Sequence, residues 1–167
     1  MVTVSGSAWT VASQVPDPEL PMLTLADLGI LRDVRQDDGA VSVTITPTYS
    51  GCPAMREISN ELRYRLEQAG YRDVAVRTAL FPPWSSDWIT DEGRRKLNEA
   101  GIAPPNAVGG RPNGPIPLTL TSRSRGIACP RCGSRDTKQT AAFSGTACKA
   151  LYSCQRCQEP FEYVKEI

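Results

Sequence analysis

Three stretches in the first hundred residues alternate hydrophobic and polar positions with a period of two, which predicts β-strands. The stretches are residues 30–35, 40–46 and 73–80. Gln36-Asp-Asp-Gly39 joins the first two and is typical of a hairpin turn. In the second strand, Val41, Val43 and Ile45 fall on one face, and we expect that face to be buried.

Between the second and third strands the hydrophobic period changes to that of a helix over residues 53–69. One apolar stripe contains Ala54, Ile58, Leu62, Leu66 and Ala69. Pro53 suits the first helical position and Gly70 the C-terminal cap. The order strand, strand, helix, strand predicts a third strand parallel to the second and a small α/β sandwich of the α+β class.

Shorter helical signals flank this core. Residues 7–14 and 90–100 predict short helices, the second ending at Gly101. Leu25–Gly29 predicts a single helical turn, with Thr24 as its cap.

A stretch rich in proline and glycine divides the chain. The 16 residues from Ala103 to Leu118 contain five prolines and three glycines, which is typical of a semi-extended linker. Residues 1–118 carry a net charge of −3 (11 basic against 14 acidic residues), whereas residues 119–167 carry +4 (8 against 4). We therefore expect a first domain over 1–103, a linker over 104–118 and a second domain over 119–167.

Composition narrows the function classes. The 167 residues contain 19 Lys+Arg and 18 Asp+Glu, and a net charge of +1 argues against a polybasic nucleic-acid-binding protein. There is no histidine, which excludes Ser-His-Asp and Cys-His hydrolases and imidazole metal ligands as mechanisms of this chain alone. The six cysteines are therefore the expected soft-metal ligands.

The expected compartment decides how the cysteines are interpreted. The first 15 residues have neither the basic nor the apolar region of a secretory signal, and no run of about 18 apolar residues occurs. We therefore expect a cytoplasmic protein with no membrane partner. In a reducing cytosol, cysteines bind metals or react more often than they form disulfides.

Four cysteines form two C-x2-C pairs separated by 21 residues. They are Cys129, Cys132, Cys154 and Cys157. This spacing predicts a four-cysteine zinc ribbon of β-hairpins that holds one structural Zn²⁺ per chain. Rubredoxin-like iron and a pair of disulfides are the alternatives. A closed four-sulfur site leaves no position for a reactive water, and binding of the metal would supply much of the folding free energy of so small a module.

The other two cysteines, Cys52 and Cys148, have no single role that the sequence pattern indicates. Cys52 adjoins the expected start of the 53–69 helix, where the helix dipole would favour a reactive thiolate, although a small buried cysteine would occupy this position equally well. Asp17 and Glu19 are the nearest candidate helpers, or else solvated loop carboxylates. Thr48 could add a hydroxyl donor. Cys148 has no C-x2-C partner and is as compatible with a tolerated cysteine as with a functional one.

The motifs of the first domain resemble the SufT-like iron-sulfur assembly domain. They are Asp17-Pro-Glu19-Leu-Pro21, Leu28-Gly-Ile30, Thr48-x-x-Gly-Cys-Pro53 and Pro83-Trp84. Together with Trp84-Ser-Ser-Asp-Trp-Ile89, the ribbon and Thr146-Ala-Cys-Lys-Ala150, the whole chain resembles the phenylacetate-degradation D family, which is the D component of the phenylacetyl-CoA epoxidase system.

The resemblance implies an accessory protein that assists maturation or insertion of iron-sulfur or iron centres in the oxygenase or its reductase. It implies that Cys52 handles a transient iron-sulfur cluster, with Asp17, Glu19 and Thr48 around it. The implied partners are the other components of the phenylacetyl-CoA epoxidase, and a homodimer would supply a second cluster ligand. No nucleic acid is expected.

Two other functions fit the residues, namely a structural adaptor of the oxygenase and a rubredoxin-like electron carrier. The chain has neither the Glu and His sets of a di-iron site nor a Gly-rich nucleotide fingerprint, so we expect an accessory protein and not an enzyme.

Overall fold

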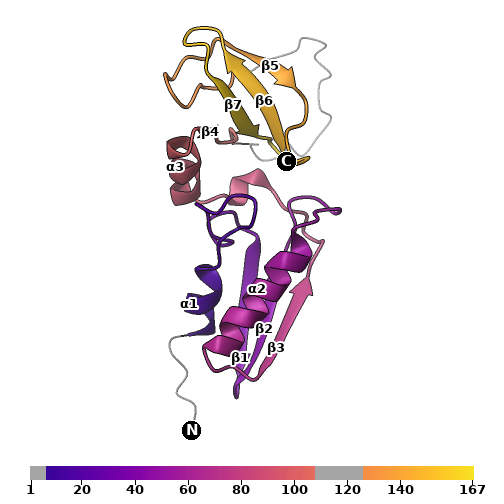
Figure 1. Cartoon of the computed structure of the whole chain (residues 1–167). Coiled ribbons are helices and arrows are strands. Elements are labelled where there is room, and N and C mark those ends of the chain that lie inside the picture. The colour runs from indigo at the N-terminus through magenta and orange to yellow at the C-terminus, as the bar shows by residue number, and fades with distance from the viewer. Residues whose placement is uncertain (1–6, 108–125) are drawn as a thin grey trace. The chain divides into compact units, whose positions relative to one another are not determined.

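The computed structural model describes residues 7–107 and 126–167, and these form two compact units. The first unit contains residues up to Lys96 together with Ile167, and the second runs from Leu97 to Glu166 (Figure 1). Each unit has its own sheet. Among the described residues, no helix is long and apolar enough to cross a membrane.

The first unit is built on a three-stranded sheet in the order β1-β2-β3. Strands β1 (Leu31–Asp37) and β2 (Ala40–Ile45) are antiparallel, and β3 (Asp73–Thr78) is parallel to β2. The hairpin turn places Asp38 and Gly39 at φ values of 44° and 89°, the left-handed conformation that a tight two-residue turn requires at both positions. The predicted hairpin and parallel third strand are confirmed.

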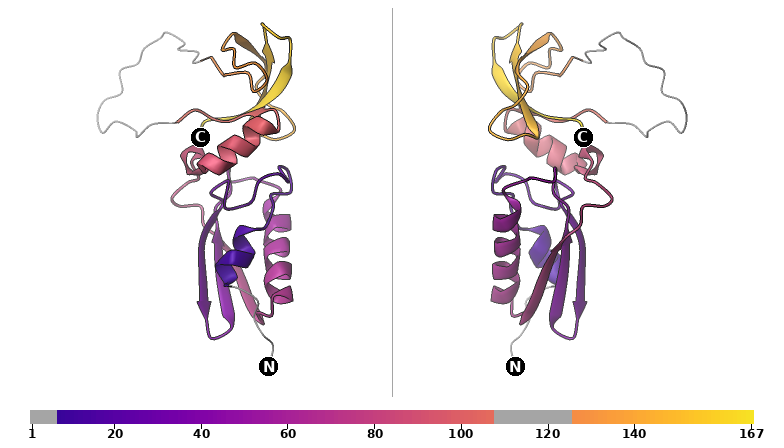
Figure 2. Two further views of the ribbon diagram at one scale, coloured as in Figure 1. Left: turned by 90° about the vertical axis from the view of Figure 1, so that its left-hand side faces the viewer. Right: turned by 90° about the vertical axis from the view of Figure 1, so that its right-hand side faces the viewer.

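Two helices cover one face of this sheet (Figures 1 and 2). They are α1 (Ala8–Ser13), with Ser7 as its N-cap, and α2 (Met55–Gln68). The predicted apolar stripe of α2 lies against the sheet: Ile58, Leu62 and Leu66 are fully buried, as are the inward residues of β2. Burying one such side chain stabilises the fold by roughly 1.5–3 kcal/mol, so this interface supplies the core of the unit.

The proline-rich segment between α1 and β1 is irregular but held by backbone hydrogen bonds. The Leu25 N–H donates to the Val15 carbonyl, and the Asp17 N–H donates to the Leu23 carbonyl, each at 2.9 Å. These bonds fold the segment back on itself, so its prolines interrupt regular structure without leaving the chain loose.

The predicted turn over residues 25–29 is confirmed, with Thr24 as its cap. Thr24 Oγ1 accepts a hydrogen bond from the Asp27 N–H at 3.1 Å, and Asp27 Oδ2 accepts one from the Thr24 N–H at 2.9 Å. Gly29 ends the turn at a φ of 67°, and a Cβ there would lie 2.6 Å from Cβ of Trp88. Only glycine fits both constraints.

After β3 the chain forms a 3-10 turn, η1 (Ser86–Trp88), and a helix, α3 (Asp91–Glu99). The nearby indole N–H of Trp84 is buried and donates to the Leu28 carbonyl at 2.9 Å. This bond ties the segment after β3 to the turn that precedes β1.

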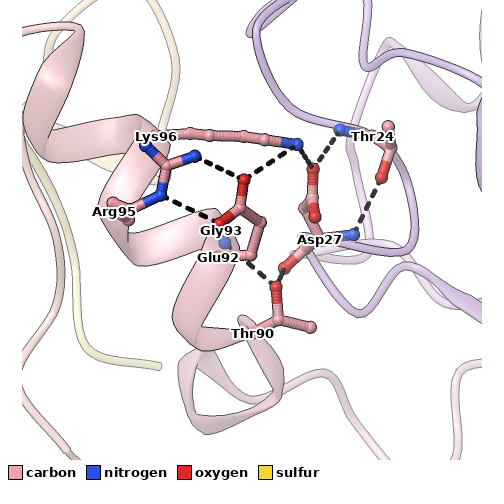
Figure 3. Close-up of polar contacts among 7 residues, drawn as sticks. All are labelled: Thr24, Asp27, Thr90, Glu92, Gly93, Arg95 and Lys96. Atoms are coloured by element: carbon pink, nitrogen blue, oxygen red, sulfur yellow. Dashed lines mark hydrogen bonds and ion pairs between the residues drawn. The ribbon is translucent and has the colours of Figure 1, made fainter.

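Asp27 attaches α3 to the same turn (Figure 3). Its carboxylate pairs with the Lys96 ammonium at 2.7 Å, and its carbonyl accepts from the Thr90 N–H at 2.9 Å. Glu92 lies 3.9 Å from the same ammonium. Burial acts to raise the pKa of Asp27, but hydrogen bonds from Lys96 and Thr24 outweigh it and hold this pKa below its ordinary value.

The second unit is a four-stranded sheet in the order β4-β7-β6-β5. Strands β5 (Thr137–Ala141), β6 (Lys149–Cys154) and β7 (Pro160–Val164) are antiparallel neighbours, and β4 (Ile102–Ala103) is parallel to β7. The residues of β4, counted with the first domain on the sequence pattern, thus hydrogen-bond to the ribbon sheet. The boundary at residue 103 stays a prediction, and most of the expected linker lies outside the described residues.

Candidate functional site: a four-cysteine cluster and the loop before helix α2

Four sulfur atoms converge in the second unit. Those of Cys129, Cys132, Cys154 and Cys157 all lie within 4.8 Å of one another. The Sγ atoms of Cys129 and Cys157 are 3.7 Å apart, and those of Cys132 and Cys154 are 3.6 Å apart. Sulfurs at the corners of a tetrahedron with bonds of roughly 2.3 Å would be about 3.8 Å apart, so the four thiols fit a tetrahedral zinc ion.

Both C-x2-C pairs form tight turns of the same kind. The residue after the second cysteine of each pair has a positive φ, 71° at Gly133 and 60° at Gln158. In the first turn the Cys129 N–H donates to the Ser134 carbonyl at 2.9 Å. In the second, the Cys154 N–H donates to the Glu159 carbonyl at 2.9 Å. The left-handed residue reverses the chain so that both sulfurs of a pair face the same point.

Backbone N–H groups stabilise the thiolate form of Cys154, which is the form that binds a metal ion. The Cys157 N–H donates to Sγ of Cys154 at 3.5 Å, and this hydrogen bond lowers the pKa of the Cys154 thiol to about 7. The neighbouring sulfurs act to raise the pKa of Cys157, so within the cluster Cys154 is the thiol that loses its proton first.

The sulfur cluster is packed against a small apolar core. The buried members are Ala103, Ile127, Cys129, Ala150, Cys154, Phe161 and Tyr163. The ring of Tyr152 stacks on Phe161 with centroids 6.0 Å apart and meets Tyr163 edge-on at 5.5 Å. Phe143 lies outside this core: it is exposed, and the ammonium of Lys165 lies 3.9 Å from its ring centroid. Packing is thus the role of three of the four ribbon aromatics.

Two ion pairs join charged side chains of the described ribbon residues. Arg131 forms an ion pair with Glu159, which joins the two cysteine turns. Lys149, the residue after Cys148, is buried and pairs with Glu162 at 2.9 Å, so its charge is engaged there. The Cys148 sulfur is half-buried, 3.2 Å from Oγ1 of Thr146.

In the first unit, the predicted start of the long helix is wrong by two residues. Helix α2 begins at Met55 with Ala54 as its N-cap, so Cys52 lies two residues before the cap and not at it. The cause is a turn: the Cys52 N–H donates to the Tyr49 carbonyl at 3.1 Å, and Pro53 follows. The helix-dipole argument for Cys52 is weakened, because that field falls off within the first turn. Cys52 is half-buried, so its surface is reachable.

The loop of Asp17 lies against the first turns of α2. Pro16 and Pro18 line a pocket of about 130 Å³ together with Glu57, Ile58 and Glu61 of that helix. Asp17 itself is buried, and its Oδ1 accepts from the N–H groups of Glu19 and Leu20 at 2.9 Å each. The solvated-loop interpretation therefore fails for Asp17, whose carboxylate holds the shape of its own loop.

Glu19 and Thr48 are both half-buried. The joint role of Cys52, Asp17, Glu19 and Thr48 stays a prediction. Sequence reasoning overlooked Asp27, the most connected carboxylate of the first unit. The spacing Thr24-x-x-Asp27, close to that of a capping box, was the signal that could have found it.

Comparisons with known proteins recognise both units. Residues 8–77 match the family model described as iron-sulfur cluster assembly protein, and residues 114–165 match the PaaD zinc beta ribbon domain. A crystal structure of a domain of unknown function, DUF59, from Bacillus anthracis superposes with a TM-score of 0.51 at 26% identity. It covers 54% of this chain and 87% of that one, and it supports the fold of the first unit.

Among similar proteins, the Fe-S protein maturation auxiliary factor of Porphyromonas gingivalis is 34% identical over 85 residues, covering 50% of this chain and 80% of that protein. An Escherichia coli (strain K12) protein assigned as the D component of 1,2-phenylacetyl-CoA epoxidase is 42% identical over 159 residues, or 95% of this chain and 91% of its own length. With an iron-sulfur assembly domain and a PaaD-type ribbon in one chain, the protein belongs to the PaaD family, the D components of phenylacetyl-CoA epoxidase.

Proposed function

We propose that this protein is an accessory component of a phenylacetyl-CoA epoxidase system and assists maturation or insertion of iron-sulfur or iron centres in its oxygenase or reductase. The observation that carries the proposal is the union, in one chain, of a domain of the iron-sulfur assembly type with a ribbon of the PaaD type. Relatives of the first unit alone are named Fe-S protein maturation auxiliary factors, which supports an accessory role.

In this proposal the first unit handles the cluster as cargo, and Cys52 is its thiolate ligand. Cysteine thiolate is the usual protein ligand of iron-sulfur clusters, and four ligands usually hold one. A single half-buried thiol would therefore hold a cluster incompletely, which suits transfer to a client and not storage. Asp17 acts indirectly, because its carboxylate fixes the loop beside α2. Glu19 belongs to that loop, and Thr48 belongs to the loop that precedes α2.

The second unit supplies a rigid module for docking to the other epoxidase components. Its four cysteines would hold one zinc ion, which supplies structure and leaves no open coordination position for chemistry. Binding of the metal contributes folding free energy that the small core cannot provide alone.

The experiment that tests this function compares Cys52→Ser with Cys148→Ser in cells that depend on the epoxidase. Both replacements remove one half-buried thiol, one from each unit, and leave the four-cysteine cluster intact. We expect Cys52→Ser to lower the iron content and activity of the epoxidase clients at least about tenfold, as for loss of a reactive thiolate, and Cys148→Ser to leave both near wild type.

If the epoxidase clients kept a normal iron content in cells carrying Cys52→Ser, the proposed maturation role would be wrong. If, in addition, the accessory protein still co-purified with the other epoxidase components until the ribbon was removed, a structural adaptor would be the better description.

A further inference from the structure

Strand β3 is an edge of its sheet, and no described residue pairs with its outer side. On its inner side the Ala79 N–H donates to the Ile45 carbonyl at 2.9 Å, which fixes the direction of the alternating backbone groups. The N–H and C=O groups of residues 73, 75 and 77 face β2, and those of Val74 and Val76 face outward. The outward groups form a ready template for another strand.

The side chains of this edge are incompletely covered. Val74 and Val76 lie on the helix-covered face, opposite Val41 and Val43 in the register of the parallel pair. Val41 and Val43 are 2% and 0% exposed, whereas both β3 valines are only half-buried. A further strand beside β3 would complete the cover of these two side chains.

The sequence of the strand is complementary to itself in charge. It reads Asp73-Val-Ala-Val-Arg77, with both charged residues exposed on the open face of the sheet. Within the described parts of the chain, neither Asp73 nor Arg77 takes part in an ion pair. Two antiparallel copies of this strand, centred on Ala75, set each acidic end opposite a basic end.

We propose that a second copy of this chain pairs antiparallel along β3, with the two-fold axis at Ala75, to form a continuous six-stranded sheet. In this register Val74 of one copy exchanges backbone hydrogen bonds with Val76 of the other, as their outward groups require. Asp73 faces Arg77 of the partner subunit in a non-hydrogen-bonded pair, where side chains approach most closely.

Moving the two-fold axis by one residue in either direction removes the pairing of opposite charges. Centring the axis on Val74 sets Asp73 opposite Ala75, and centring it on Val76 sets Arg77 opposite Ala75, so each leaves the charges without partners. One register alone satisfies the outward backbone groups, the valines and the charges together.

The proposed pairing keeps the two Cys52 residues apart. Cys52 follows β2, which is parallel to β3, so it lies towards the carboxyl end of both strands. In an antiparallel dimer these ends point in opposite directions, separated by about 20 Å, the length of a six-residue strand. The dimer therefore does not form by sharing a cluster, and the inference is independent of the proposed function.

The test is sedimentation of the full chain over a concentration series, with single and paired charge reversals. We expect a reversible dimer, weakened at least about tenfold by Asp73→Arg or Arg77→Asp, because each sets like charges opposite one another twice per dimer. The double variant Asp73→Arg/Arg77→Asp restores opposite charges and should return to within about threefold of wild type. Asp37→Arg, an exposed charge on the opposite edge strand β1, is the control and should have no effect.

Two further measurements test the proposal without changing the sequence of β3. They are amide hydrogen exchange of the wild-type chain and the association of the Cys52→Ser variant. The amide hydrogens of Val74 and Val76 should exchange at least about tenfold more slowly at high protein concentration. Cys52→Ser and removal of iron should leave the association unchanged. A wild-type chain that is monomeric throughout, single reversals without effect, or a dimer that dissociates with Cys52→Ser would each overturn the proposal.

Discussion

Gly133 and Gln158 occupy equivalent places, each directly after a C-x2-C pair and each with a positive φ. Glycine adopts this conformation freely, whereas other residues are strained there. A Cβ at Gly133 would meet no atom within 4 Å, so the effect of a substitution there is conformational and not steric.

We therefore predict opposite effects at the two positions. Gln158→Gly should stabilise the ribbon by up to about 1 kcal/mol, and Gly133→Ala should destabilise it by roughly 1–2 kcal/mol. The measurement is denaturant unfolding of the metal-loaded full chain, followed through amide signals of β6 and β7. Equal effects of the same sign at both positions would contradict the conformational explanation.

Residue-level patterns predicted some of these roles and not others. The C-x2-C spacing identified all four metal-ligating cysteines, because two convergent pairs are a local constraint written directly in the sequence. Asp17 was recognised by resemblance, but its use of the carboxylate to bind two backbone N–H groups depends on how the proline-rich loop folds. No pattern marked Phe143 as exposed, because burial of an aromatic depends on which sheet face it meets.

At the scale of elements, the hydrophobic periods predicted the order and pairing of β1, β2, α2 and β3. Periodicity fixes which face is buried, and short connections then limit the topology. The start of α2 was missed, because Pro53 suits both a turn and a first helical position. Strand β4 was missed as well, since its two residues are too few to show any period.

Asp27 makes the attachment of α3 to the turn before β1 sensitive to acid. Its pKa is held below the ordinary value, so the ionised form is the one that the fold stabilises. This stabilisation is complete above an ordinary carboxyl pKa of about 3.9 and is lost as the pH falls through the lowered pKa of the folded state.

We predict that Asp27→Asn lowers the free energy of unfolding of the first unit by about 1–2 kcal/mol at pH 7, through loss of charge-assisted hydrogen bonds to Lys96 and Thr24. The difference from wild type should shrink below about pH 4. Urea unfolding followed through amide signals of α2 measures it, with the exposed Asp37→Asn as control. A difference that persists unchanged to strong acid would exclude this account.

At the scale of the whole molecule, charge and the proline-rich stretch predicted domains over 1–103 and 119–167, and these bounds stay a prediction, whereas the two compact units of the structure meet between Lys96 and Leu97. Each unit has its own sheet and its own buried core, and the metal-ligating cysteines all belong to the second. A sequence pattern did not place Ile102–Ala103 beside β7, because that pairing joins residues about 60 positions apart and depends on tertiary folding.

We predict that the two units respond differently to loss of metal. A strong chelator, or Cys129→Ser, should release one zinc per chain and unfold the ribbon, because metal binding supplies much of its stability. The backbone amides of β1, β2 and α2 should keep their protection from exchange. Metal analysis of the untreated chain separates the alternatives: one zinc and no colour supports the structural site, whereas stoichiometric iron would support an electron carrier.

The buried indole of Trp84, bonded to the Leu28 carbonyl, also provides an intrinsic fluorescence probe of folding. All three tryptophans of the chain, Trp9, Trp84 and Trp88, belong to the first unit, and the ribbon has only tyrosine and phenylalanine. Intrinsic fluorescence excited at the red edge of the indole band therefore reports the folding of one unit without interference from the other.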